Sequence, residues 1–203
     1  MLGMERYSLS AVGNVRCTPM TKPIAIATGC LLLAATSVAT AKAPKPVKVS
    51  MNLIDTTGVG KSIGTITIAQ TAKGLQLVPA LKGLPPGEHG LHVHENGSCA
   101  PADKDGQPTA GQAAGGHYDP DGTKAHKGPG GGGHKGDLPK LVVGAKGTAN
   151  SKIEVPGLKL ADVAGRALVI HEGGDNYSDT PKPLGGGGTR IACGVIPGGT
   201  AAK

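Results

Sequence analysis

The sequence predicts an all-β protein, a sandwich or barrel of roughly eight short antiparallel strands that carries two long functional loops. Outside the N-terminal region no segment has a sustained apolar repeat of helical period. Short strand-like runs are instead separated by glycine- and proline-containing turn signals. The predicted strands are residues 47–53, 63–70, 75–81, 89–95, 141–147, 151–155, 167–171 and 190–196.

The strands follow from their side-chain pattern and from the turns between them. Residues 47–53, "VKVSMNL", alternate apolar and polar side chains strictly, as a strand with one buried face does. The turn signals include Thr57-Gly58, Lys73-Gly74 and Pro156-Gly157, which fall between consecutive predicted strands. These features favour antiparallel strands joined by tight turns.

Two long segments, residues 96–139 and 172–189, show no strand pattern. Both are rich in glycine and aspartate, and the first also contains lysine and histidine. Structureless loops of this length are uncommon in compact domains and are usually functional or disordered. We therefore expect the chemistry of the protein to reside in these loops.

Composition restricts the size and the partners of the protein. The chain has 203 residues, enough for one domain, and it contains no Trp, no Phe and 3 Tyr, so its core has to be aliphatic. The formal net charge is +7, but the lysines are scattered and few aromatic residues are available for base stacking. We therefore predict no nucleic-acid partner, and expect the charge to attract small anions.

The N-terminal region reads as a targeting segment. Residues 20–41 have a positive start, an apolar run and a small-x-small cleavage pattern at residues 39–41, which is typical of a secretory signal peptide. The apolar run is shorter than the roughly 20 residues that span a membrane, so we predict export and no membrane span. Residues 1–19 then form an extension upstream of the true start, and residues 42–46 a flexible leader. A lipid anchor at Cys30 is the alternative.

Export also determines which cysteines remain. Removal of the signal discards Cys17 and Cys30 and leaves Cys99 and Cys193. In an oxidising compartment an isolated pair is expected to form a disulfide. The alternative is two unrelated buried thiols.

Three histidines lie close together in the stretch "GEHGLHVHENGSC". On a strand, His92 and His94 point to the same face, and the leucine and valine that alternate with them point to the other. Such a pair is either two ligands of one metal ion or a chance occurrence. His89, three positions before His92, faces away from the pair, and we interpret it as a structural residue.

Further metal-ligand candidates lie in the two long loops and at one strand end. They are His117, His126, His134, Asp137, His171 and Asp175. Imidazole nitrogens with a carboxylate suit copper and zinc. A glycine-rich loop carrying His126, His134 and Asp137 cannot bury enough apolar surface to fold alone, so a metal would organise it. Because His171 ends a predicted strand, strand-borne and loop-borne ligands suggest two sites.

Five motifs in this order resemble the copper/zinc superoxide dismutases, and specifically their bacterial periplasmic branch. They are "HGLHVHENGSC", "GGHYDP", "GHKGDLP", "ALVIHEGGDNYSD" and "GGGGTRIACGVI", and the resemblance runs from about Val47 to Ile196. Each motif alone is weak, whereas all five at matching spacing are specific. The sequence departs from the family at Leu91, where phenylalanine is common, and at the glycine run 130–133.

The resemblance implies an eight-stranded Greek-key β-barrel over residues 47–203, with one copper and one zinc ion per subunit. The implied copper ligands are His92, His94, His117 and His171. The implied zinc ligands are His117, His126, His134 and Asp137, so that His117 bridges the two metals. Asp175 would accept hydrogen bonds from a copper ligand and a zinc ligand. Cys99 and Cys193 match the family disulfide, and Arg190 matches an arginine beside the open face of the copper.

The activity implied is dismutation of superoxide to oxygen and hydrogen peroxide, in antioxidant defence in the periplasm. Arg190 and His117 would act directly in catalysis, the first on the substrate anion and the second as the bridging imidazolate and proton carrier. An exported copper or zinc carrier is the main alternative, although a carrier needs neither Arg190 nor a shared ligand. A zinc hydrolase fits less well, since it requires an open zinc position. Self-association into a homodimer is left open.

Overall fold

A computed structural model describes residues 44–198 of the chain, all within one compact unit. The predicted upstream extension, the signal peptide with Cys30, and the first residues of the leader lie outside the described residues, as do residues 199–203. Over residues 44–198, no helix is long and apolar enough to cross a membrane.

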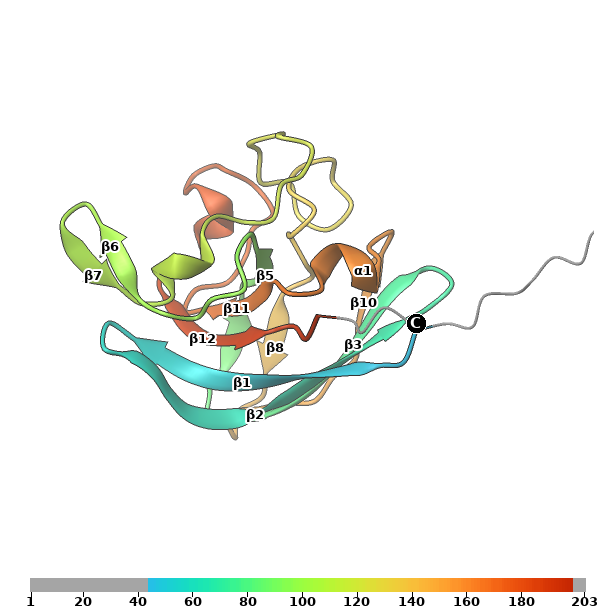
Figure 1. Cartoon of the computed structure of the whole chain (residues 1–203), viewed down its shortest axis with the longest axis horizontal. Helices are drawn as coiled ribbons and strands as arrows, with labels where there is room; N and C mark the ends of the chain where they lie inside the picture. The colour runs from blue at the N-terminus through green and yellow to red at the C-terminus, as the bar shows by residue number, and fades with distance from the viewer. Residues whose placement is uncertain (1–43, 199–203) are drawn as a thin grey trace, which may run out of the picture. The chain divides into compact units, whose positions relative to one another are not determined.

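The fold is built on one curled antiparallel sheet of eight strands (Figure 1). Its strands are β1 (Val47–Asp55), β2 (Gly58–Gln70), β3 (Gly74–Lys82), β5 (Leu91–His94), β9 (Thr148–Ala149), β10 (Ile153–Pro156), β11 (Ala167–His171) and β12 (Arg190–Val195). They are ordered β10-β3-β2-β1-β12-β11-β5, with β9 also pairing with β3. The first strand thus pairs with the last, and the prediction of an all-β Greek-key barrel is confirmed.

Two small strand pairs and three short helical turns complete the described part. The pairs are β4 (Gly87–His89) with β8 (Leu141–Val143), and β6 (Ala102–Lys104) with β7 (Gln107–Thr109). The helical turns are η1 (Gln112–Ala114), α1 (Leu160–Val163) and η2 (Leu184–Gly186). The two long loops gather on the same side of the sheet, above β11 and β12 in the view of Figure 1.

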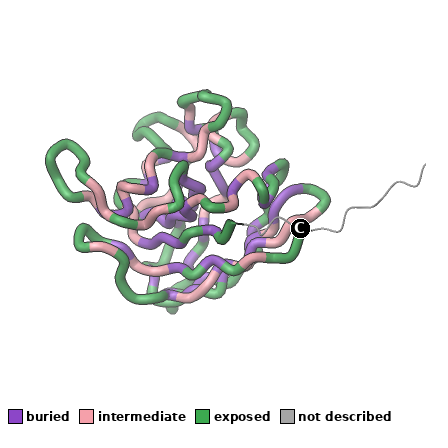
Figure 2. Tube along the Cα trace, in the orientation of Figure 1, coloured by how far each residue is buried: buried purple, intermediate pink, exposed green. Residues whose placement is uncertain are grey.

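The core follows from the alternating side chains of the strands. In β1, Val49 and Met51 are buried, whereas Lys48 and Ser50, which alternate with them, are exposed. The buried side chains of the main core are aliphatic residues and methionine, as the composition predicts. Buried segments therefore lie inside the curled sheet and exposed ones at its turns and loop tips (Figure 2).

Two predicted strands are shorter in the structure than predicted, and the predicted strand 63–70 begins earlier, at Gly58. The predicted strand 89–95 is interrupted at Gly90, whose N–H donates to Gly173 at 2.8 Å and whose carbonyl accepts the N–H of His171 at 2.9 Å. The chain therefore changes partner there: β4 pairs with β8, and β5 pairs with β11. The predicted strand 141–147 ends at Val143, because a turn with Gly147 in the left-handed region separates β8 from β9.

This interruption explains the position of His89. One ring nitrogen of His89 lies 2.8 Å from the carbonyl oxygen of His171, and the other lies 2.9 Å from that of Pro85. His89 therefore contacts backbone carbonyls, as expected, and both of its ring nitrogens are engaged by them. Loop 96–139 also differs from the prediction, because it contains the β6-β7 hairpin and η1 rather than being irregular throughout.

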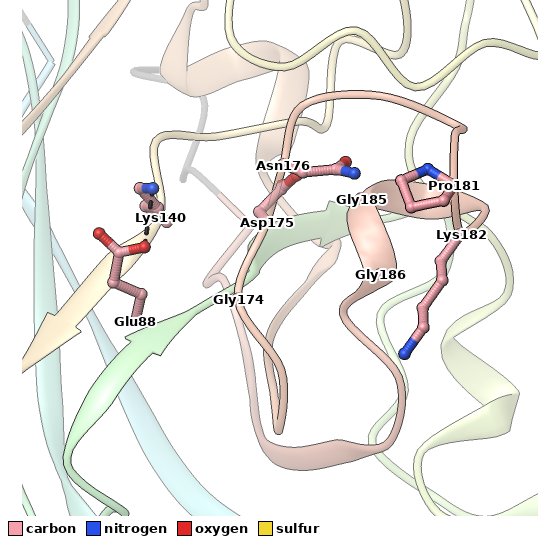
Figure 3. A pocket seen from close by; sticks show the side chains of 9 residues that line it. All are labelled: Glu88, Lys140, Gly174, Asp175, Asn176, Pro181, Lys182, Gly185 and Gly186. Atoms are coloured by element: carbon pink, nitrogen blue, oxygen red, sulfur yellow. Dashed lines mark hydrogen bonds and ion pairs between the residues drawn. The ribbon is translucent and has the colours of Figure 1, made fainter.

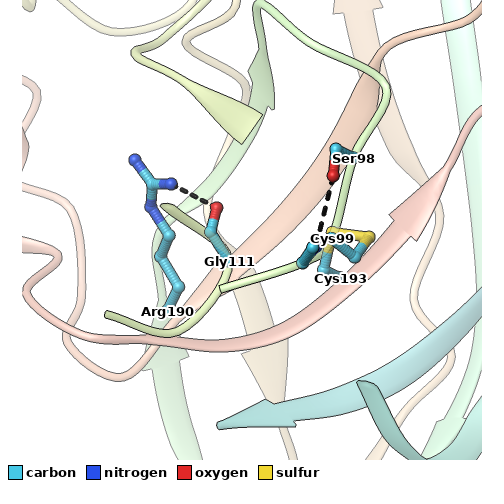
Figure 4. The surroundings of a disulfide bond; sticks show 6 residues. Ser98, Cys99, Gly111, Arg190 and Cys193 are labelled. Carbon is cyan, nitrogen blue, oxygen red and sulfur yellow. Dashed lines mark hydrogen bonds between the residues drawn. A yellow bond between two sulfur atoms is a disulfide. The ribbon is translucent and has the colours of Figure 1, made fainter. Parts of the chain in front are cut away.

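A disulfide joins Cys99 to Cys193, as predicted. Cys193 is a buried residue of β12, and Cys99 precedes the β6-β7 hairpin (Figure 4). The bond closes a separation of 94 residues and ties the first long loop to the last strand. This loop contributes acceptor groups to the site described below.

Replacing both Cys99 and Cys193 with serine is expected to lower the free energy of unfolding by about 2–5 kcal/mol, because the unfolded chain regains the freedom of a long loop. Urea denaturation of the metal-free protein measures this change without a contribution from bound metal. Wild-type protein with its disulfide reduced should match the double variant. Equal urea midpoints for the oxidised wild type and the double variant would contradict the prediction.

Candidate metal centre

Four buried histidines converge at the edge of the sheet. His92, His94, His117 and His171 each offer a ring nitrogen, and these four atoms lie within 4.8 Å of one another. Strand pairing brings them together: β5, with His92 and His94, pairs with β11, which ends at His171. A backbone bridge between His94 and His117 adds the fourth residue from the first long loop. All four predicted copper ligands therefore lie in one cluster.

A second cluster adjoins the first. Ligand atoms of His92, His117, His126 and Asp137 also lie within 4.8 Å of one another. His134, the remaining predicted zinc ligand, lies next to this group, with Nδ1 3.3 Å from Oδ1 of Asp137. His92 belongs to the tight group because its ring stacks on that of His117, with ring centroids 4.0 Å apart. The predicted zinc ligands are thus neighbours, although His134 is outside the tightest group of four.

His117 belongs to both clusters. Its Nδ1 lies 2.9 Å from Oδ1 of Asp137, on the side of the second cluster. Its ring centroid is 5.0 Å from that of His94 and 5.9 Å from that of His171, in the first cluster. Because Nδ1 is directed to Asp137, the other ring nitrogen is left for the first cluster.

Asp175 connects the two clusters through one histidine of each, His92 and His126. Its Oδ2 accepts a hydrogen bond from Nε2 of His92, and its Oδ1 accepts one from Nε2 of His126, both at 2.8 Å. Both histidines are thereby oriented with Nδ1 away from Asp175. Among the described residues, neither Nδ1 has a hydrogen-bond partner, although both are buried and Nδ1 of His126 lies 3.0 Å from Oδ2 of Asp137.

These buried ring nitrogens without hydrogen bonds fit metal ions. A buried polar atom without a partner is costly, and an imidazole lone pair directed at other imidazoles is what a metal site requires. The donor set of the first cluster is nitrogen only, and that of the second includes a carboxylate oxygen. Both sets suit copper or zinc.

Burial keeps most of these histidines neutral. It lowers the pKa of His94 and of His171 well below the usual value, and that of His117 to about 4. His126 differs: burial lowers its pKa, but the adjacent carboxylates of Asp137 and Asp175 outweigh this and raise the value to about 9. Against the effect of burial, His117 and His126 beside Asp137, and His126 and His92 beside Asp175, hold the pKa values of both carboxyl groups well below their usual range. Neutral imidazole is the form that binds metals.

Zinc binding to the metal-free protein should release about one proton near neutral pH. The pKa of His126 is raised to about 9, so its ring is protonated at neutral pH and must lose a proton to bind a metal. His117, with a pKa of about 4, is already neutral and contributes none on binding a single metal. Titration calorimetry in buffers of different ionisation enthalpy measures the release. The release should fall as the pH rises through about 9, and its absence near neutral pH would contradict the assignment.

Arg190 lies at the start of β12, and its side chain extends toward the carbonyl of Gly111 (Figure 4). Its guanidinium group donates hydrogen bonds to the carbonyl oxygens of Gly111 and Gly115, at 2.5 and 2.6 Å. The Gly115 carbonyl also accepts a hydrogen bond from Nδ1 of His94 at 2.9 Å. Burial is the main cause of the lowered pKa values of His94 and His171, and the positive charge of Arg190 lowers them further. Loop 96–139 therefore fixes the arginine through its backbone.

A cavity of about 430 Å³ lies on the outer side of Asp175 (Figure 3). Glu88 and Lys140, joined by an ion pair at 2.8 Å, line one part, and Pro181 and Lys182 line another. None of the histidines described above lines this cavity. We therefore do not assign it to the chemistry of the two clusters.

Two contributions were not predicted from the sequence. Tyr177 donates its N–H to Oδ1 of Asp175 at 2.7 Å, and its hydroxyl oxygen accepts the N–H of Lys140 at 3.1 Å. Its ring packs so closely on Gly128 that a Cβ there would come within 2.6 Å of it. The carbonyls of Gly111 and Gly115 are the second contribution, and a backbone acceptor has no side-chain signal in a sequence.

The chain is similar to known proteins over most of its length. A family model described as copper/zinc superoxide dismutase (SODC) matches residues 62–196. The curated "Superoxide dismutase [Cu-Zn]" of Escherichia coli (strain K12) is 55% identical over 167 residues, which cover 82% of this chain and 96% of that protein.

Solved structures give the same result. The copper/zinc superoxide dismutase from Brucella abortus superposes with a TM-score of 0.73 at 51% identity, covering 75% of this chain and 99% of that one. The monomeric copper, zinc superoxide dismutase from Salmonella enterica has a TM-score of 0.68 at 60% identity, with coverages of 75% and 99%.

Proposed function

Since the chain belongs to the copper/zinc superoxide dismutase family, we propose that the two clusters form one binuclear centre around His117. The activity of the chain is dismutation of superoxide to oxygen and hydrogen peroxide, and its cofactors are copper and zinc. In the proposed assignment the copper ligands are His92, His94, His117 and His171. The zinc ligands are His117, His126, His134 and Asp137.

One observation carries this assignment: His92 and His117 both belong to both groups of converging ligand atoms, but Nε2 of His92 donates to Asp175, so His117 is the shared residue whose two ring nitrogens both face the clusters. A ring that lies between two sites can bind one metal through each nitrogen. The unpartnered Nδ1 atoms of His92 and His126 support the two sites separately. A metal carrier has no use for a shared ligand or for an arginine held at the edge of the copper cluster.

Copper held by His92, His94, His117 and His171 would supply the one-electron redox chemistry by which two superoxide ions become one oxygen and one peroxide. The residues of the chain orient the anion and deliver a proton. Arg190 orients the anion, because its guanidinium is fixed by two carbonyls and keeps its charge. The peroxide requires two protons, and we propose that His117 delivers one from its copper-side nitrogen while solvent delivers the other. Nδ1 of His117 faces Oδ1 of Asp137 at 2.9 Å, so in the proposed centre this nitrogen would be held on the zinc side while the copper-side nitrogen carries the proton.

Reconstitution with both metals tests the proposed centre. We expect the loaded protein to remove superoxide far faster than either buffer or the metal-free protein, with one copper and one zinc bound per chain. Protein that holds both metals but removes superoxide no faster than buffer would instead be a carrier. Loss of zinc on replacement of His134 with alanine, with copper retained, would support the place of His134 in the zinc set.

We also propose that the chain acts in the periplasm, after removal of residues 20–41 as a signal peptide. The start of the signal at Met20, with its positive residue and small-x-small end, supports this. Fractionation of bacteria that express the full chain, with the mass of the mature protein, tests the location and the cleavage site. Recovery in the membrane fraction with a lipid on Cys30 would favour the anchored alternative.

The oligomeric state stays a prediction, with a homodimer left open. The solved relative from Salmonella enterica is described as monomeric. Light scattering on the metal-loaded protein distinguishes the two states, because the full chain has a mass of 20.1 kDa.

A further inference from the structure

We propose that Glu95 is a positioning residue for both His94 and Arg190, acting through the peptide group that joins Gly115 to Gly116. The inference rests on the copper site proposed above. It starts from the Gly115 carbonyl, which accepts hydrogen bonds from Nδ1 of His94 at 2.9 Å and from the guanidinium of Arg190 at 2.6 Å. One oxygen thus fixes a proposed copper ligand and the proposed substrate-binding arginine.

This carbonyl determines which nitrogen of His94 is available to a metal. A neutral imidazole has one N–H, and donation of that N–H from Nδ1 to Gly115 leaves the lone pair on Nε2. Nε2 of His94 lies 3.4 Å from Nε2 of His171, inside the copper cluster. Rotation of the Gly115 carbonyl would therefore disturb both the ligand and the arginine.

The other end of the same peptide group is held by Glu95. A trans peptide is planar, with the carbonyl of one residue and the N–H of the next pointing in opposite directions. The N–H of Gly116 donates to Oε2 of Glu95 at 3.0 Å. Because the plane is rigid, a carboxylate that fixes the N–H also fixes the direction of the carbonyl. It further polarises the peptide and strengthens the carbonyl as an acceptor.

The peptide needs such support because its two residues have no side chains to pack. Gly115 adopts a φ of +77°, and a Cβ there would come within 2.6 Å of Oε2 of Glu95. Glu95 itself is anchored through its backbone: its N–H donates to the Gly116 carbonyl at 3.0 Å, and its carbonyl accepts from Arg166 at 2.6 Å. The carboxylate is therefore aimed from a fixed backbone, although Glu95 is exposed.

Two variants of Glu95 separate its hydrogen bond from its charge. Glu95→Ala removes both the acceptor and the negative charge. Glu95→Gln removes the charge but keeps an oxygen that can accept the N–H of Gly116. Glu154→Ala is the matched control, because Glu154 is likewise exposed and accepts one hydrogen bond, from Gln76 at 2.7 Å, on β10.

The test measures the electron paramagnetic resonance spectrum of bound Cu²⁺ in the metal-loaded variants, with the salt dependence of superoxide consumption. We expect Glu95→Ala to change the copper spectrum and to lower kcat/KM by about fivefold, the size of one lost hydrogen bond. Its rate should also depend less on salt, because Arg190 is no longer fixed. Glu95→Gln should restore the wild-type spectrum and rate, and Glu154→Ala should leave both unchanged.

Three results would overturn the proposal. A wild-type copper spectrum in Glu95→Ala would show that the peptide does not need the carboxylate. Equal changes in Glu95→Ala and Glu95→Gln would mean that the charge, and not the hydrogen bond, matters. If wild-type protein itself lacks nitrogen ligands in its copper spectrum, the proposed copper site fails, and the role of Glu95 with it. Only this last failure is visible without any variant.

Discussion

Replacing His171 with alanine is expected to abolish copper binding and superoxide consumption while zinc stays bound. His171 lies at the end of β11 and belongs to the four-histidine cluster, but not to the group that contains Asp137. Its loss removes one nitrogen from the proposed copper set and leaves the zinc ligands in place. We expect copper affinity and turnover each to fall by more than about 100-fold, since even residues behind the ligands contribute 10–100-fold.

Metal analysis by mass spectrometry and superoxide consumption by pulse radiolysis measure these effects. The zinc content is the internal control, because a misfolded variant would lose both metals. Full copper content with wild-type turnover in His171→Ala would contradict the proposed copper set.

Replacing Arg190 with alanine should lower kcat/KM by about 10- to 100-fold without removing either metal, because the charge that attracts and orients the anion is lost. The rate of wild-type protein should fall with rising salt, which screens this attraction, and the rate of Arg190→Ala should fall less. Arg190→Lys should recover only part of the loss. A lysine keeps the charge but cannot hold the carbonyls of Gly111 and Gly115 in the fixed geometry of a guanidinium.

Stopped-flow or pulse-radiolysis measurements over a range of salt concentrations distinguish these variants. Unchanged rates and an unchanged salt dependence in Arg190→Ala would show that the arginine does not act on the substrate. Loss of copper from Arg190→Ala would point instead to a role in holding His94, with which it shares the Gly115 carbonyl.

Much of the fold could be predicted because its strands alternate buried and exposed side chains. In β1 the sequence pattern and the observed burial of Val49 and Met51 agree. The interruption at Gly90 could not be predicted, because it depends on hydrogen bonds to Gly173 and His171 from another part of the chain. The turn at Gly147 is a similar case, since the sequence of the run 141–147 does not reveal that Gly147, and not Gly144, adopts the left-handed conformation.

In the candidate site, too, some residues could be predicted from the sequence and others could not. Side chains with specific chemistry, such as His117 and Asp175, were recognised from their motifs and lie together in the structure. The groups that fix their geometry were not recognised, because they are backbone atoms or ordinary side chains. The Gly115 carbonyl and the Tyr177 ring act only through contacts that the folded chain creates.

Anomalous diffraction from crystals of the metal-loaded protein, collected on both sides of the copper and zinc absorption edges, tests the shared centre most directly. The account predicts one copper and one zinc, each bound to a different ring nitrogen of His117. Two metal ions that share no ligand would contradict the shared centre. A single metal position with anomalous signal at both edges, bound to only one nitrogen of His117, would contradict it as well.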